Sequence, residues 1–264
     1  MSSKVPDLVF HYHTSLGDNF ICNAIVHIYA EQLCERLHIP CHHRYYQTIK
    51  CLYQDFDNII VHSFSDDWAT LESEMFHWAQ QKQWPITRIG FENVYYRNMR
   101  RVNCPEEFFA VNFDRQFYEQ ANILFKERYE KFVLPKKISG ADKLYRNLTG
   151  SEKDYIIVHD SSSVEKIYPI DLWSWRKNNQ NKDIKIIKIS EGQTNNMLDY
   201  VKLIENAKEI HCVPSSFFCL VDSICTKINA DLYFHDIRMN NLMQVNCWTT
   251  GKNRWNIIDY QQKM

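Results

Sequence analysis

The sequence predicts an α/β protein made of two Rossmann-like domains that face a central cleft. Patterns typical of buried strands alternate with amphipathic helical patterns, which favours parallel sheets covered by helices. The alternation occurs twice, and a polar segment with Pro and Gly at residues 135–154 separates the two halves. A length of 264 residues also suits one large domain or two small ones. We therefore expect an N-terminal domain over 1–140 and a C-terminal domain over 141–264.

The first half contains three strand patterns and three helical patterns. Apolar β-branched and aromatic residues mark the strands, and apolar residues at helical spacing mark the helices. The third helical region is rich in Phe and Tyr, which we interpret as core residues. In chain order we expect a strand at 7–13, a helix at about 19–37, a strand at 58–64, a helix at 66–81, a strand at 86–92 and a region at 104–134 that is helical in its second half.

The second half repeats this alternation after the polar segment. Its first predicted helix has a Pro near the start, where the missing N–H costs little. The expected elements are a strand at 155–160, a helix at 168–179, a strand at 184–190, a helix at 196–207, a strand at 209–215, a helix at 216–226 and a strand at 230–236. The final residues, 253–264, are expected to form a helix that packs back on the first domain.

Composition excludes several classes of protein. Hydrophobic residues make up 45% of the chain and charged residues 24%, the balance of a soluble globular protein. The net charge of -1 gives no general electrostatic attraction for nucleic acid or an anionic membrane. No apolar run approaches the roughly 20 residues of a membrane span. We therefore expect no nucleic-acid partner and no integral membrane segment.

Cysteine usage and the N-terminus both indicate a cytoplasmic protein. The nine cysteines are scattered and form no CxxC pair, which favours reduced thiols over a disulfide framework. The first ten residues lack the basic start and apolar core of a signal peptide.

Three turns between a predicted strand and the following helix carry candidate chemistry. In "TSLGD" (14–18), Gly17 allows a sharp turn or a close backbone approach to a ligand, and Asp18 is either a helix N-cap or a reactive carboxylate. Such turns lie beyond the carboxyl ends of parallel strands, where open α/β sheets bind ligands.

The other two turns suit phosphate. In "HDSSSVEKIYPIDLW" (159–173), Ser161, Ser162 and Lys166 offer hydroxyls and a positive charge, although a solvated loop with a Ser-rich turn is the better explanation of this stretch taken alone. In "VPSSFF" (213–218), the amides of residues 215–217 would stand at a helix N-terminus, a natural anion site, or Ser would simply cap the helix.

Together the three turns resemble GT-B fold glycosyltransferases, and most closely the heptosyltransferase-like group, glycosyltransferase family 9. "TSLGD" is similar to that family's first Gly-Asp turn, and the Lys, aromatic-Pro and Trp of "HDSSSVEKIYPIDLW" stand in step with its second motif. "VPSSFFCL" occupies the place of the third motif. There the chain has Pro214, Ser216 and Cys219 where the family has Asp, Gly and His. Its Ser-Ser-Phe is closer to some fucosyltransferase-like chains.

The resemblance implies transfer of a sugar from a nucleoside diphosphate sugar to an acceptor hydroxyl on a glycan or glycoconjugate. It makes Asp18 the catalytic base, with inversion at the anomeric carbon, and Lys166 the charge that stabilises the departing diphosphate. It predicts no metal cofactor. It assigns donor binding to six further residues, Gly17, Ser161, Ser162, Ser215, Ser216 and Phe217.

Further residues are candidates for substrate contacts. Glu191 follows a predicted strand and is a candidate for the nucleotide ribose, although a surface Glu is as plausible. His13, beside the Gly-Asp turn, is a candidate for the acceptor. The segments 40–55 and 93–106, which hold several Tyr and Arg residues, are interpreted as acceptor loops.

Four other interpretations stay open from the sequence. "DFD" (55–57) fits the Asp-x-Asp of a metal-dependent GT-A glycosyltransferase, but it precedes a strand. A sugar-nucleotide epimerase can share the GT-B architecture. A non-catalytic nucleotide- or glycan-binding protein would need Asp18 only as a cap. "HYH" (11–13) and "CHH" (41–43) are dense in possible metal ligands, and His11 and His13 are spaced for metal ligation, although no established zinc spacing joins the two groups.

Overall fold

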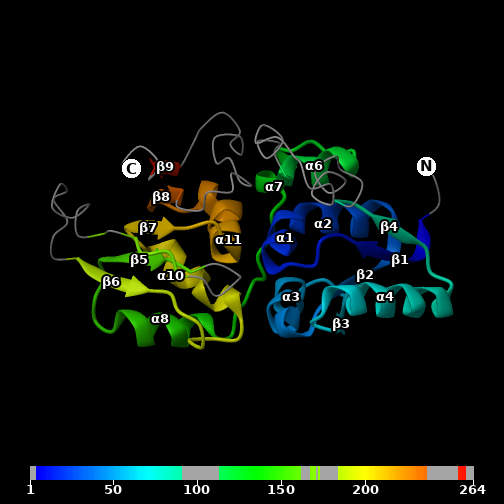
Figure 1. Ribbon diagram of the computed structural model, residues 1–264, viewed down its shortest axis with the longest axis horizontal. Coiled ribbons are helices and arrows are strands. Elements are labelled where there is room, and N and C mark those ends of the chain that lie inside the picture. The colour runs from blue at the N-terminus through cyan, green and yellow to red at the C-terminus, as the bar shows by residue number, and fades with distance from the viewer. Residues whose placement is uncertain are drawn as a thin grey trace. The chain divides into compact units, whose positions relative to one another are not determined.

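The structure is a computed structural model that describes residues 4–90, 113–161, 167–170, 172, 184–236 and 255–259. By its internal contacts the chain divides into two compact units, unit 1 over residues 1–137 and unit 2 over 138–264. The sequence analysis placed the boundary between 140 and 141. Each unit contains a parallel sheet with helices packed on it (Figure 1).

Unit 1 is built around a four-stranded sheet in the order β3-β2-β1-β4, with every pair of neighbours parallel. This order is that of one half of a Rossmann fold. The elements are β1 (Val5–His11), α1 (Leu16–Ile21), α2 (Asn23–Gln32), β2 (Cys34–His42), η1 (His43–Tyr45), α3 (Tyr46–Leu52), β3 (Ile59–Phe64), α4 (Trp68–Lys82), β4 (Ile86–Arg88), α6 (Phe113–Gln120) and α7 (Glu127–Glu130).

The central strand β1 buries side chains on both faces, as a strand flanked by two others and covered by helices should. Val9 packs in a buried cluster with Met75 and Ala79 of α4. Phe10, which points to the opposite face, lies 5.0 Å from Tyr29 of α2 between ring centroids. Helices α4 and α2 therefore cover opposite faces of this sheet.

The predicted helix at 19–37 is wrong in its last turn. The helical residues divide into α1 and α2 and end at Gln32, and residues 34–42 form strand β2. Glu35, Arg36 and Leu37 are good helix formers, so local propensity favoured a longer helix. Pairing decides otherwise, because β2 lies between β1 and β3 and bonds to both.

A buried ion pair joins α6 to α7. The Arg128 guanidinium donates to the Asp114 carboxylate, and both side chains are fully buried. Arg128→Met should lower the free energy of unfolding by about 3–5 kcal/mol, because it leaves a buried carboxylate without its guanidinium partner. The double variant Arg128→Met/Asp114→Leu is expected to recover most of the loss, because no buried charge is left. Urea denaturation of the wild type, the single variant and the double variant measures this. An equal loss of stability in the single and double variants would contradict a buried ion pair.

Unit 2 is built around a five-stranded parallel sheet in the order β6-β5-β7-β8-β9. This is the flavodoxin-like order of doubly wound folds. The elements are α8 (Ala141–Thr149), β5 (Tyr155–His159), β6 (Lys185–Lys188), η3 (Met197–Tyr200), α10 (Val201–Asn206), β7 (Glu209–Cys212), α11 (Ser216–Ile224), η4 (Cys225–Lys227), β8 (Asp231–Asp236) and β9 (Trp255–Asp259).

The predicted C-terminal helix is also wrong, since its five described residues form strand β9. This strand pairs with β8 in parallel register, with Leu232 opposite Trp255. Trp255 is 3% exposed, contacts Phe218 of α11 at 4.8 Å between ring centroids, and donates from Nε1 to Asp222 Oδ1 at 2.9 Å. These contacts anchor β9 to α11 within unit 2, which accounts for strand rather than helix.

Two smaller differences concern element bounds. Strand β4 stops at Arg88, whereas the sequence predicted a strand to residue 92. The polar segment at 135–154, expected to be a linker with a helix inside it, contributes helix α8, which packs on η3 and α10. The helix predicted at 168–179 falls largely outside the described residues.

Within the described ranges, no helix combines the length and apolar character needed to cross a bilayer.

Candidate functional site

The predicted turns lie at the topological switch point of each sheet. In unit 1 the chain passes from β1 to β2 on one side and later returns to β4 on the other side of β1. In unit 2, β6 and β7 flank β5 in the same way. In open α/β sheets, ligands bind beyond the carboxyl ends of the strands at such points, because the connections there leave in opposite directions.

Asp18 is not a helix N-cap. Helix α1 begins at Leu16, its N-cap residue is Ser15, and Asp18 is the third residue of the helix. The buried Asn19 side chain fixes this turn, since its Oδ1 accepts from Tyr12 Oη at 2.5 Å and its Nδ2 donates to Ser15 O at 2.9 Å. The cap interpretation of Asp18 is therefore wrong, and its carboxyl is held at the switch point of unit 1.

The environment of Asp18 keeps its carboxyl protonated at neutral pH. The residue is 8% exposed, and burial raises the pKa of Asp18 to about 8, although a hydrogen bond from the Ser15 side chain lowers it in part. A second ionisable side chain, that of His13, lies close to it, with Nδ1 3.9 Å from Asp18 Oδ2. Burial lowers the pKa of His13 to about 4, against a hydrogen bond with the Gly90 backbone. Both groups are therefore mainly neutral at pH 7.

His13 lies between β1 and β4, the two strands at the switch point. Gly90 follows β4 with a φ of 88°, and a Cβ there would come within 2.4 Å of Phe117 Cε1 and 3.3 Å of His13 Cδ2. Only glycine fits this backbone conformation and this space. The sequence analysis did not single out Gly90, and only the packing reveals why a glycine is needed.

His42 and Trp68 border the same turn and were not predicted as site residues. His42 Nδ1 is 3.0 Å from Ser65 O, which only accepts, so Nε2 is the nitrogen that accepts from Thr14 Oγ1 at 2.9 Å. The Trp68 ring lies against His42 and His13, at 5.8 and 6.2 Å between ring centroids. His42 ends β2, and its place at the carboxyl end of a strand is a signal that the sequence analysis could have used.

Gly17 was predicted either to allow a sharp turn or to let the backbone approach a donor, and the second role stays a prediction. It is a buried residue in the first turn of α1, and it is not among the glycines with positive φ. The sharp-turn explanation is therefore wrong.

The segment 40–55, interpreted as an acceptor loop, is mostly regular structure. It completes β2 and then forms η1 and α3. Cationic and aromatic side chains pair on it, with the Arg44 guanidinium 5.0 Å from the Tyr45 ring and Lys50 Nζ 5.5 Å from the Tyr46 ring. The second predicted acceptor loop, 93–106, lies outside the described residues.

In unit 2, Ser215 is the N-cap of α11. Its Oγ accepts from Phe218 N at 3.2 Å and lies 3.0 Å from Val213 O. The amides of Ser216 and Phe217, the first two of the helix, make no hydrogen bond among the described residues. They remain available to an anion at the helix N-terminus.

His159 joins the two predicted phosphate turns, and the sequence analysis did not list it as a site residue. Its Nδ1 lies 3.2 Å from Ser215 Oγ, and its Nε2 lies 3.5 Å from Ser161 Oγ. The ring stacks on Phe217 at 4.9 Å with an interplanar angle of 14°. Burial lowers the pKa of His159 to about 4, so the ring is a neutral hydrogen-bonding bridge.

Of the remaining predicted donor residues of unit 2, the structure describes Glu191 alone. Glu191 lies in an exposed turn after β6. Ser162 and Lys166 lie outside the described residues. Asp160, which follows β5 and was not predicted as a site residue, forms an ion pair with Lys188, with Oδ2 2.8 Å from Lys188 Nζ.

Ser215→Ala should lower the free energy of unfolding by about 1 kcal/mol, because it removes the hydroxyl that caps α11. Denaturant titration measures this change. Ser216→Ala removes a neighbouring hydroxyl that makes no cap bond, and should change stability by less than about 0.5 kcal/mol. Equal effects of the two variants would contradict the cap assignment.

The metal-site interpretations gain no support from the described residues. No group of three or more His, Cys, Asp or Glu side chains is placed to hold a metal ion in that part of the chain. His11 is fully buried, with its ring 5.7 Å from Phe76. In "DFD", Asp55 accepts from Lys136 N at 2.6 Å, and the motif precedes β3 at its amino end.

Comparison with known proteins supports the fold. No protein-family model matches the sequence, and no curated protein sequence matches it. The solved structures that resemble it include the iron-containing dodecameric glycosyltransferase TibC from enterotoxigenic E. coli, a glycosyl transferase family 9 protein from Veillonella parvula, and the E. coli ADP-heptose LPS heptosyltransferase II.

The extent of these likenesses is large, but the sequence identities are low. TibC matches with a TM-score of 0.53 and 15% identity over 93% of this chain, and the chain spans 62% of TibC. The family 9 protein matches with a TM-score of 0.60 and 8% identity, over 99% of this chain and 88% of that protein. The heptosyltransferase matches with a TM-score of 0.55 and 10% identity, over 96% of this chain and 90% of that protein. The resemblance to family 9 is thus confirmed at the level of fold, and the chain has the α/β fold of these GT-B glycosyltransferases.

Proposed function

We propose that this protein is a glycosyltransferase that moves a sugar from a nucleoside diphosphate sugar to a hydroxyl of a glycan or glycoconjugate acceptor. The observation that carries the proposal is Asp18, a buried carboxyl at the switch point of unit 1 whose pKa burial raises to about 8. A base is most effective when its pKa lies near the working pH, so this carboxyl suits removal of a hydroxyl proton.

In the proposed reaction the acceptor oxygen attacks the anomeric carbon while its proton passes to the Asp18 carboxylate. The bond from that carbon to the diphosphate oxygen breaks, and the diphosphate leaves with the electron pair. Attack opposite the leaving group inverts the anomeric configuration. His13, 3.9 Å from Asp18, and the cation–aromatic pairs of η1 and α3 are the proposed acceptor contacts.

On the donor side, we assign the diphosphate to the turns of unit 2. The amides of Ser216 and Phe217, together with Ser161, Ser162 and Lys166, would stabilise the negative charge that grows as the diphosphate departs. The Ser215 hydroxyl already caps α11, so we assign it to positioning the turn together with His159. Glu191 remains the proposed ribose contact. This set would supply the stabilising charge without a metal.

The test is a thermal-shift panel with UDP, GDP, ADP, CMP and dTDP. A ligand at 100 times its dissociation constant stabilises the folded state by about 2.7 kcal/mol, which shifts Tm by roughly 5–10 °C. We expect one nucleotide to stabilise the wild type and to act less on Lys166→Ala. If none does, the transferase proposal fails at its donor site.

Ser216→Pro offers a sharper test of the helix-terminus amides. Proline is tolerated at the first helical position, and the extended backbone of Ser215 (φ −165°, ψ 172°) suits the residue before a proline. The variant thus deletes one amide donor without breaking α11, and nucleotide affinity should fall about tenfold. Ser216→Ala, which keeps the amide, separates this effect from that of the hydroxyl.

Turnover distinguishes the alternatives. Once a nucleotide is identified, its sugar conjugates are tested for transfer with and without EDTA. Epimerisation without an acceptor would indicate a GT-B epimerase, and tight binding without turnover would indicate a nucleotide- or glycan-binding protein.

A further inference from the structure

A cavity of unit 1 lies at the opposite end of its strands from Asp18. Its volume is 540 Å³, within the range of roughly 300–1,000 Å³ typical of small-molecule sites. Lys4, which directly precedes β1, lines it, as do Asn58 and Ile59 at the start of β3. The cavity is therefore at the amino ends of the strands, whereas Asp18 follows the carboxyl end of β1.

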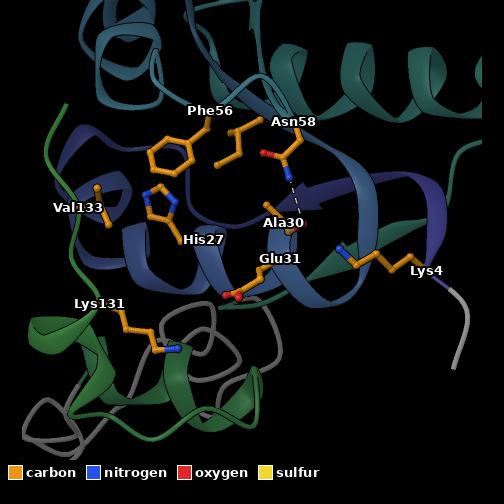
Figure 2. Close-up of a pocket in the computed structure, with 9 residues that line it drawn as sticks. Lys4, His27, Ala30, Glu31, Phe56, Asn58, Lys131 and Val133 are labelled. Atoms are coloured by element: carbon orange, nitrogen blue, oxygen red, sulfur yellow. Dashed lines mark hydrogen bonds between the residues drawn. The ribbon is translucent and has the colours of Figure 1, made fainter. Parts of the chain in front are cut away.

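The cavity has an aromatic and apolar wall. Figure 2 shows the His27 ring beside Phe56, and their centroids are 4.4 Å apart. Val133 and Ile59 add apolar surface. Asn58 Nδ2 donates to Ala30 O at 3.1 Å, which closes the last turn of α2 against the start of β3. This wall suits the flat or apolar body of a small organic molecule.

Polar groups of the cavity lack partners within the described part of the chain. His27 Nε2 is buried and has no hydrogen-bond partner there. Burial lowers the pKa of His27 to about 4, so the ring is neutral. Buried polar atoms such as His27 Nε2 normally have partners. Lys4, Lys131 and Glu31 are exposed, form no ion pair within the described part of the chain, and border the cavity (Figure 2).

We propose that this cavity binds an aromatic monoanion, such as an aromatic carboxylate or sulfonate. The ring would lie against Phe56 and His27, and the anionic group would lie between Lys4 and Lys131. Two ammonium groups against one carboxylate leave one net positive charge, which favours a monoanion over a dianion. The site is separate from the proposed catalytic edge and does not depend on the proposed function.

The test uses 8-anilinonaphthalene-1-sulfonate, an aromatic monoanion, titrated by fluorescence into the full chain. We expect one site per chain and about tenfold weaker binding for Lys4→Gln/Lys131→Gln, because both charge-assisted contacts are lost. Lys82→Gln/Lys126→Gln removes two exposed lysines elsewhere on unit 1 and is the matched control. It should bind like the wild type.

Glu31→Gln provides a change of opposite sign, since removing the carboxylate should strengthen binding severalfold. A variant that simply misfolds cannot produce this result. N-Phenyl-1-naphthylamine, which has the same rings without the sulfonate, should bind more weakly than the anion. Equal affinity of the two lysine double variants, equal affinity for the neutral dye, or displacement of the sulfonate by the nucleotides of the thermal-shift panel would each overturn the proposal.

Discussion

Asp18→Asn should lower the rate of sugar transfer by about 10²–10⁴-fold and, at the same time, stabilise the protein. The loss of rate follows because an amide cannot accept the acceptor's proton, and general-base catalysis contributes a factor of that size. The wild-type rate should rise as pH increases through about 8, since only the ionised carboxylate acts as a base. The residual activity of the variant should lack this dependence.

The gain in stability follows from the same pKa. The pKa of Asp18 is about 8 in the folded protein and near 3.8 when exposed, so between these values the folded state holds one proton more than the unfolded state. Stability therefore falls as pH rises through this range, by roughly 4 kcal/mol at pH 7. Asn cannot ionise, so the variant should have a higher free energy of unfolding above pH 5, measured by urea denaturation.

Asp57→Asn is the matched control for this prediction. Asp57 is exposed and belongs to the "DFD" motif that a metal-dependent GT-A enzyme would use. Its substitution should change neither rate nor stability appreciably. If Asp57→Asn abolishes transfer and Asp18→Asn does not, the assignment of the base is wrong.

Acidification from pH 7 to pH 5 should destabilise the protein strongly because several histidines are buried without charge. Burial lowers the pKa of His11 and His235 to about 3 and that of His159 to about 4. Below about 6.5 the unfolded chain binds a proton at each, whereas the folded chain does not, so stability falls as pH falls. At pH 5 the loss is about 2 kcal/mol for each histidine.

Three such losses are comparable with the whole stability of a typical domain, roughly 5–15 kcal/mol. Asp18 acts in the opposite direction, because its folded state holds the extra proton, and offsets part of the change. Urea denaturation at pH 8, 7, 6 and 5 measures the slope. This slope reports the number of protons that the chain takes up on unfolding. His11→Leu should reduce that number by about one, and His77→Gln, on the exposed face of α4, should leave it unchanged. An unchanged slope in His11→Leu would refute the explanation.

The sequence by itself determined the α/β alternation and the positions of the strand-to-helix turns. These depend on local signals, namely the period of apolar residues and the presence of Gly, Pro and Ser between elements. That is why the turns at Asp18, Ser161 and Ser215 could be singled out before any strand order was known. The likeness to family 9 glycosyltransferases was recognised from the same turns.

Only the tertiary structure decided the rest, because it depends on contacts between distant residues. Strands β2 and β9 form since they pair with neighbouring strands, although residues 34–37 and 253–264 suggested helices locally. His159 joins Ser161 to Ser215 only when β5 and β7 lie side by side. The pKa of Asp18 is likewise a consequence of burial, and no local pattern in "TSLGD" distinguishes a buried carboxyl from an exposed one.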